Sequence, residues 1–140
     1  MSEKTVLLVE DNPDDEALTL NAFDNGPVPH LMVVVRDGAE ALDYLFGNGR
    51  DAAAVPSLIL LDLKLPKISG LEVLERVRAD PRTRLVPVVV LSSSDEPDDM
   101  FNSYRLGANS YVRKSIDFDQ FARGMHMLAE YWLQLNEYVR

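Results

Sequence analysis

The sequence has no cysteine among its 140 residues. This absence excludes disulfide bonds, cysteine nucleophiles and zinc sites built on thiolate ligands. Histidine is also scarce: His30 and His126 lie far apart in unrelated segments, so we expect no histidine-based metal site. The carboxylates are therefore the metal ligands that this chain has in quantity.

Long apolar runs and positive charge are also lacking. No run approaches the roughly 18 apolar residues of a membrane-spanning helix. The short polar stretch of residues 1–4 before the first apolar segment leads us to expect no targeting segment. The 14 Lys and Arg residues are outnumbered by 23 Asp and Glu, which gives a net charge of -9. Because nucleic-acid phosphates bind clustered basic residues, direct nucleic-acid binding is not expected. We expect a cytoplasmic protein of one globular domain, residues 1–140, with no output domain and no membrane contact.

Apolar segments alternate with helical patterns along the chain, which predicts an α/β fold. Strands are predicted over residues 5–9, 31–35, 57–61, 86–91 and 110–112. Helices are predicted over residues 13–24, 38–46, 69–79 and 97–106, and an extended last helix follows Asp117. Purely aliphatic strands are typical of a parallel sheet covered on both faces, so we predict a doubly wound five-stranded parallel sheet of order 2-1-3-4-5. Residues 47–56 are predicted to form a long loop, to which no role is assigned.

Capping residues mark the predicted helix ends. Asn12 stands before the first helix as its N-cap, and Asp95 is expected to cap the fourth helix, which Gly107 closes. Asp117 and Gln120 have capping-box spacing at the start of the last helix.

The last helix has more apolar surface than one face against a sheet requires. A stripe at helical spacing is predicted to be core: Phe118, Phe121, Ala122, Met125, Ala129 and Trp132. Further apolar and aromatic residues lie outside it: Met127, Tyr131, Leu133 and Tyr138. Such a surplus is typical of an interface, although scattered hydrophobic residues are also exposed on monomers. We therefore predict a homodimer through the last helix.

Charged and polar residues follow four of the predicted strands: Glu10, Asp11, Asp62, Ser92 and Lys114. In a sheet of order 2-1-3-4-5 the first and third strands are neighbours at the switch point, so Glu10, Asp11 and Asp62 are expected to share one crevice. Three carboxylates this close repel each other unless a cation joins them. Carboxylate oxygens without nitrogen or sulfur ligands favour Mg²⁺ or Mn²⁺, so the sequence predicts a divalent metal site.

Asp62 is the candidate nucleophile, because it closes the buried aliphatic run from Leu58 to Leu61. An aspartate beside a bound metal can attack a phosphoryl group, whose charge then needs positive and hydrogen-bonding partners. Lys114 can neutralise one phosphoryl oxygen, and the Ser92 hydroxyl can donate to another. This combination of residues predicts phosphoryl chemistry at Asp62.

The chain resembles the receiver domains of response regulators in two-component signalling, from about residue 4 to the last helix. The matching positions are Glu10, Asp11, Asp62, Pro66, Gly70, Ser92, Tyr111 and Lys114. The resemblance implies a flavodoxin-like receiver fold and a phosphoacceptor role for Asp62 in a phosphorelay, with a sensor histidine kinase as partner. Stretches such as AEALDYLFG and LDLKLPKISGLEVL are similar to single-domain regulators that serve bacterial phytochromes, which implies a kinase of the phytochrome type.

The same resemblance implies further site roles. Mg²⁺ would be bound by Asp11, Asp62 and the backbone carbonyl of Lys64, with Glu10 acting through bound water. Ser92 and Tyr111 would be the switch residues that report phosphorylation, and the switch would alter a protein-interaction surface. Lys64 and Ser94 would modulate the lifetime of the phosphorylated state.

Two positions depart from the receiver pattern, Lys64 two residues after Asp62 and Ser115. Ser115 follows Lys114, where most receivers have a proline that makes a cis peptide bond. Since a cis bond before a residue other than proline costs about 3 to 4 kcal/mol, the state of the Lys114–Ser115 peptide is left open.

Three other functions were compared with the phosphoacceptor hypothesis. A phosphatase of the haloacid-dehalogenase kind needs a second aspartate two residues after its nucleophile, and this chain has Lys64 there. A flavin or nucleotide binder needs phosphate-binding amides after the first strand, where Glu10, Asp11, Asp14 and Asp15 would repel phosphate. An unphosphorylated receiver-like scaffold stays open as the alternative. The favoured interpretation is a phosphoacceptor domain, not an enzyme, that assists its own phosphorylation and dephosphorylation.

Overall fold

The computed structural model describes residues 4–24, 29–47, 55–114 and 117–138. Ser115 and most of the loop at 47–56 lie outside these ranges. The cis or trans state of the Lys114–Ser115 peptide therefore lies outside the described residues. Five parallel strands form one sheet: β1 (Lys4–Val9), β2 (His30–Val35), β3 (Leu58–Leu61), β4 (Val88–Ser92) and β5 (Ser110–Arg113). Their order is β2-β1-β3-β4-β5, which confirms the predicted doubly wound topology.

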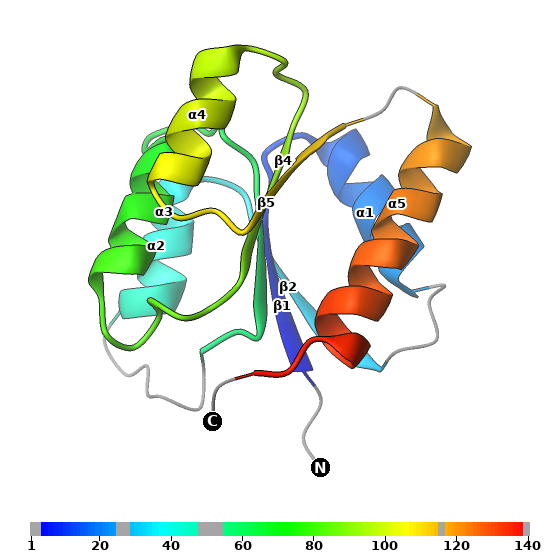
Figure 1. Cartoon of the computed structure of the whole chain (residues 1–140), viewed down its shortest axis with the longest axis horizontal. Coiled ribbons are helices and arrows are strands. Elements are labelled where there is room, and N and C mark those ends of the chain that lie inside the picture. The colour runs from blue at the N-terminus through cyan, green and yellow to red at the C-terminus, as the bar shows by residue number, and fades with distance from the viewer. Residues whose placement is uncertain (1–3, 25–28, 48–54, 115–116, 139–140) are drawn as a thin grey trace.

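Helices cover both faces of the sheet (Figure 1). On one face lie α1 (Pro13–Asp24) and α5 (Phe118–Glu130), and on the other lie α2 (Gly38–Phe46), α3 (Gly70–Ala79) and α4 (Pro97–Arg105). Every residue of β3 and β4 is buried, because both faces of these central strands are covered, and this explains their aliphatic sequences. In the described part of the chain, none of the helices has the length and apolar character needed to cross a bilayer.

The first and last helices begin as predicted. The side-chain oxygen Oδ1 of Asn12 accepts the backbone N–H groups of Asp14 and Asp15 at 2.9 and 3.0 Å. Asp117 accepts the N–H of Gln120 at 3.0 Å. These bonds satisfy donors that the first helical turn leaves without an intrahelical partner.

The start of α4 differs from the prediction, because Asp95 is not its cap. Glu96 occupies the N-cap position and makes no capping bond with its side chain. Pro97 takes the first helical position, where its fixed backbone angle starts the helix and its missing N–H leaves one donor fewer to satisfy. The N–H of Glu96 is bound by Ser94 Oγ at 3.1 Å. Ser94 therefore organises the entry to α4.

The last helix departs from its predicted stripe at two positions. Phe118 was expected in the core and is 66% exposed, because it lies in the first turn of α5, where it lines a surface hollow with Asp14 and Leu18. Leu133 was expected in the exposed surplus and is only 2% exposed. The chain continues from α5 into a π-helical turn, Tyr131–Leu135, and Leu133 packs in the same core cluster as Ala129, which precedes it by four residues.

The remaining members of the predicted stripe are buried or partly buried against the sheet: Phe121, Ala122, Met125, Ala129 and Trp132. Met127 and Tyr131 are exposed, as expected of a surplus. Tyr138 is half-buried, because its ring lies over the ammonium group of Lys4 and its hydroxyl donates to the Trp132 carbonyl.

Arg78 of α3 joins the loops at the amino ends of β4 and β5. Its guanidinium group donates to the carbonyl oxygens of Gly107 at 2.9 Å, Arg84 at 3.1 Å and Val86 at 2.7 Å. It also donates to Asn109 Oδ1 at 2.9 Å. No pattern in the sequence indicated this role, which depends on the rigid fork of guanidinium donors.

Candidate functional site

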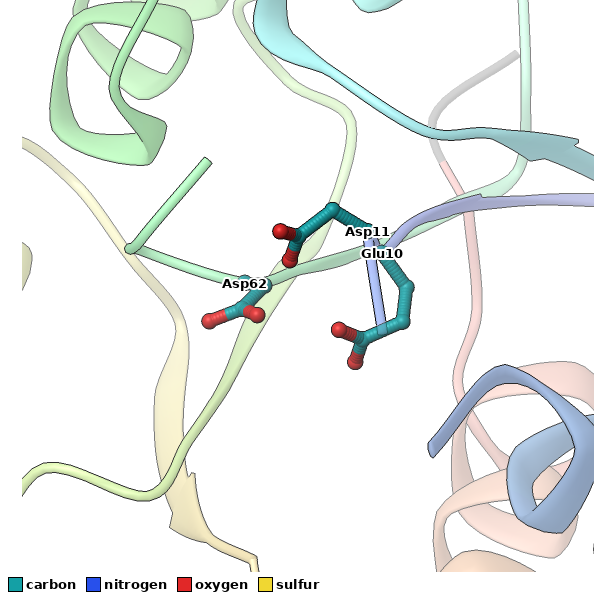
Figure 2. A group of neighbouring side chains, drawn as sticks. All are labelled: Glu10, Asp11 and Asp62. Atoms are coloured by element: carbon teal, nitrogen blue, oxygen red, sulfur yellow. The ribbon is translucent and has the colours of Figure 1, made fainter. Parts of the chain in front are cut away.

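Three carboxylates from two neighbouring strands meet at the carboxyl edge of the sheet (Figure 2). The parallel register places Val9 opposite Leu61, so Glu10 and Asp11 leave β1 beside the point where Asp62 leaves β3. Their ligand oxygens all lie within 4.8 Å of one another. Glu10 is 1% exposed and Asp62 8% exposed, whereas Asp11 faces solvent. The expected shared crevice is therefore present.

Lys114 contributes the positive charge at this edge. Its Nζ lies 2.7 Å from Glu10 Oε1, 2.8 Å from Asp15 Oδ2 and 3.3 Å from Asp62 Oδ2. Pairing of β5 with β4 positions Lys114, whose backbone N–H donates to the Ser92 carbonyl at 2.9 Å. Asp15 was expected only to repel a bound phosphate, and its ion pair with Lys114 is a contact that the sequence did not indicate.

The pKa values reflect this crowding. Burial raises the pKa of Glu10 to about 7, with the nearby Asp62 charge adding to the effect, and the hydrogen bond and charge of Lys114 oppose it only in part. Burial by itself would lower the pKa of Lys114, but hydrogen bonds to Asp15 and Glu10 and the charge of Asp62 together raise it above its usual value. Lys114 is therefore an ammonium group at neutral pH, and one such group does not balance the surrounding carboxylates.

The donor set fits a hard divalent cation. The three clustered ligands are all carboxylates, one of them solvent-facing, and Glu10 is held in a site that disfavours its charge. A cation beside the cluster would relieve this repulsion. The arrangement therefore suits oxygen-preferring ions such as Mg²⁺ or Mn²⁺.

The loop after β3 holds Asp62 through its backbone. A Cβ on Gly70 would lie 2.2 Å from the carbonyl oxygen of Asp62, so only glycine permits α3 to begin this close to the site. The N–H of Gly70 also donates to the Leu63 carbonyl at 2.9 Å. The backbone N–H of Lys64 donates to Asp62 Oδ1 at 3.3 Å, while the Lys64 side chain is exposed. These contacts give a physical reason for the spacing between Asp62 and Gly70.

Ser92, Ser94 and Tyr111 form a second group of contacts at the same edge. Ser92 ends β4 and is buried, and its Oγ accepts the N–H of Ser94 at 3.1 Å. The Tyr111 hydroxyl donates to the Ser94 carbonyl at 3.0 Å. The two predicted switch residues are thus joined through Ser94.

Comparison with known proteins finds receiver domains. Residues 6–125 match the response regulator receiver domain family. The chain is 39% identical to the probable methanogenesis regulatory protein FilR2 of Methanothrix harundinacea, over 94% of this chain and 84% of that protein. It is 36% identical to response regulator Rcp1 of Synechocystis sp., over 94% of this chain and 90% of that protein.

Two solved structures have closely similar folds. The phosphorylated cyanobacterial phytochrome response regulator RcpA superposes with a TM-score of 0.92 at 44% identity, covering 99% of this chain and 100% of that chain. The Mn²⁺-bound form of Rcp1 superposes with a TM-score of 0.90 at 34% identity, covering 98% of this chain and 99% of that chain.

Proposed function

This chain belongs to the response regulator receiver domain family, and on that premise we propose that Asp62 is its phosphoacceptor in a two-component phosphorelay. Receiver domains take phosphoryl groups from sensor histidine kinases. The main observation in support is the meeting of Asp62 with Glu10, Asp11 and Lys114 at one edge of the sheet.

The transfer is a displacement at phosphorus. An oxygen of Asp62 attacks the phosphorus of a phosphohistidine; the new O–P bond forms as the N–P bond breaks, and the imidazole nitrogen leaves with the bonding pair. The Lys114 ammonium group, 3.3 Å from Asp62 Oδ2, is near enough to bind a phosphoryl oxygen, and the Ser92 hydroxyl can donate to another. Dephosphorylation reverses the state when water attacks the phosphorus, which releases phosphate and restores the Asp62 carboxylate. The domain would thus assist its own phosphorylation and dephosphorylation.

The proposed cofactor is Mg²⁺, which Mn²⁺ could replace. Asp11, Asp62 and the backbone carbonyl of Lys64 would hold it, and Glu10 would act through bound water. When bound, the ion supplies positive charge for the phosphoryl oxygens. The carboxylate cluster and the Mn²⁺-bound structure of Rcp1 support a divalent ion at this site.

The proposed signal is a change of protein-interaction surface. A phosphoryl group adds about two negative charges at Asp62. Ser92 and Tyr111 are the proposed switch residues, and Lys64 and Ser94 the proposed modulators of the phosphoryl lifetime. Residues 1–140 would act in the cytoplasm as one receiver domain, without nucleic-acid binding. Similarity to RcpA supports a sensor kinase of the phytochrome type.

Exposed apolar residues after the middle of α5 support a homodimer through the last helix. Met127 and Leu135 are each 70% exposed, and Tyr131 is 49% exposed. Such residues are typical of an interface when they gather on one surface. Sedimentation velocity tests this: Met127→Glu should convert dimer to monomer, while Gln134→Glu, at another exposed position, should not. A wild-type monomer both with and without a phosphoryl mimic would contradict the dimer.

Intact-mass spectrometry separates the phosphoacceptor from the scaffold alternative. After incubation with acetyl phosphate and Mg²⁺, the wild type should gain one phosphoryl group, and a chelator should prevent the gain. Asp62→Asn should show no adduct, whereas Asp14→Asn, an exposed carboxylate near the same edge, should react normally. A folded wild type that gains no mass would favour the scaffold.

A further inference from the structure

The loop between β4 and α4 is held by a hydrogen-bond network centred on Ser94. The Ser94 hydroxyl donates to Asp99 Oδ2 at 2.5 Å and accepts the N–H of Glu96 at 3.1 Å. The Ser94 N–H donates to Ser92 Oγ at 3.1 Å, and its carbonyl accepts the Tyr111 hydroxyl at 3.0 Å. Each polar group of this buried serine is therefore engaged, so Ser94 cannot shift without breaking a bond.

Asp99 is held in place independently of Ser94. Its backbone carbonyl, in the first turn of α4, accepts the Ser103 hydroxyl at 2.7 Å. Ser103, one turn further along α4, is fully buried. The Asp99 backbone is therefore tied into α4, and its half-buried carboxylate lies beside Ser94, whereas the neighbouring Asp98 is exposed.

We propose that Asp99 is a positioning residue that opposes the movement of Ser92 toward a phosphoryl group on Asp62. This inference rests on the proposed function. Ser92 can move toward Asp62 only by stretching its bond with the Ser94 N–H or by drawing Ser94 along. The second movement strains the Ser94–Asp99 bond, which is stronger than a neutral hydrogen bond because its acceptor is charged.

The single proton of the Ser94 hydroxyl is committed to Asp99. A serine hydroxyl has one proton, and here it is directed to Asp99 and away from other acceptors. Asp99 therefore sets how readily the loop responds to phosphorylation. Its removal should favour the phosphorylated arrangement, and removal of the Ser94 hydroxyl should have the same effect because it breaks the same bond.

Binding of beryllofluoride with Mg²⁺, a mimic of the aspartyl phosphoryl group, tests the proposal. Fluorescence titration of Asp99→Ala should show about tenfold tighter binding than wild type, the size expected for a charged hydrogen bond. Ser94→Ala should show a similar gain in beryllofluoride affinity. The double variant should bind no more tightly than either single variant, because both substitutions remove the same interaction. Asp99→Asn keeps an acceptor but loses its charge, so its affinity should fall between those of wild type and Asp99→Ala. Asp98→Ala, which removes the same charge from the same helical turn, should be unchanged.

The outcomes distinguish this proposal from the proposed function. Unchanged or weaker binding by Asp99→Ala, with normal binding by wild type, overturns the role of Asp99 and leaves the phosphoacceptor intact. Failure of the folded wild type to bind contradicts the phosphoacceptor itself. In that case hydrogen exchange in the metal-free protein still tests whether Asp99 restrains the loop. The Glu96 amide should exchange faster in Asp99→Ala than in Asp98→Ala, and equal rates would overturn the proposed role of Asp99.

Discussion

The two ends of the same five strands differ in how their polar groups are paired. At the amino ends, Arg78 donates to three carbonyl oxygens and one side-chain oxygen, and Lys4 donates to the Leu133 carbonyl. Cationic donors there meet neutral oxygen acceptors, so each of these contacts is attractive and none brings like charges together.

At the carboxyl ends the charges are unbalanced. Glu10, Asp11 and Asp62 lie within 4.8 Å of one another, and the single ammonium group of Lys114 is shared with a further carboxylate, Asp15. This fold therefore stabilises one edge of its sheet and leaves repulsion between carboxylates at the other, where a ligand can relieve it. Natural proteins accept such local destabilisation at functional sites.

The largest effect on stability is expected at the amino edge. Arg78→Met should lower the free energy of unfolding by about 2 to 4 kcal/mol, because the Gly107 and Val86 carbonyls lose their donor. Urea denaturation measures this, with Arg76→Met, an exposed position of the same helix, as the control. The folded fraction should still accept phosphate. If Arg78→Met lost phosphorylation while its stability stayed unchanged, the amino edge would serve the chemistry and not the stability of the fold.

At the carboxyl edge, a divalent cation should stabilise the protein. Mg²⁺ at about ten times its dissociation constant should raise the free energy of unfolding by roughly 1.4 kcal/mol through mass action. Asp11→Asn should lose most of this gain, whereas the control Asp14→Asn should keep it. Equal stabilisation of both variants would show that the ion binds elsewhere.

Without metal, removal of a carboxylate from the cluster should stabilise the fold. Asp11→Asn in the presence of a chelator should raise the free energy of unfolding by about 0.5 to 1 kcal/mol, because one like charge is removed. Glu75→Gln, at an exposed position of α3, should change stability by no more than about 0.5 kcal/mol. A lower stability of Asp11→Asn would mean that no repulsion exists in the cluster.

The smallest effect concerns Asp37, the N-cap of α2 near the same edge. A hydrogen bond from the Glu40 N–H at 2.7 Å, followed by the charge of Lys67, holds the pKa of Asp37 below its usual value of 3.8. The folded state therefore favours the charged form, and this stability is present at neutral pH and is lost as the pH falls through the lowered pKa.

Asp37→Asn should accordingly be less stable than wild type at neutral pH, with the difference shrinking in acid below pH 3.8. Urea denaturation at both pH values checks the sign. If the difference in the free energy of unfolding between wild type and Asp37→Asn stayed constant or grew in acid, the folded state would not favour the charged form of Asp37.

The strand order and the meeting of Glu10, Asp11 and Asp62 could be predicted from the sequence. Aliphatic runs identify buried parallel strands, and the doubly wound order makes the first and third strands neighbours. Residues that end these strands must then lie side by side. This part of the site follows from topology alone.

Side-chain contacts across long sequence separations could not be predicted. Arg78 and Asp15 are ordinary surface residue types, and their partners are brought to them only by the assembled sheet. The residue type of Asp95 favours a helix cap, but the N-cap of α4 is Glu96, because Pro97 takes the first helical position.

The central claim is that the charge imbalance at the carboxyl edge serves phosphoryl transfer to Asp62. Borohydride reduces an aspartyl phosphate to homoserine, so peptide mass spectrometry after treatment with acetyl phosphate, Mg²⁺ and borohydride locates the phosphoacceptor. The account predicts homoserine in place of Asp62 and at no other aspartate. Homoserine in place of Asp11, or an unmodified Asp62 in folded, metal-bound protein, would contradict it.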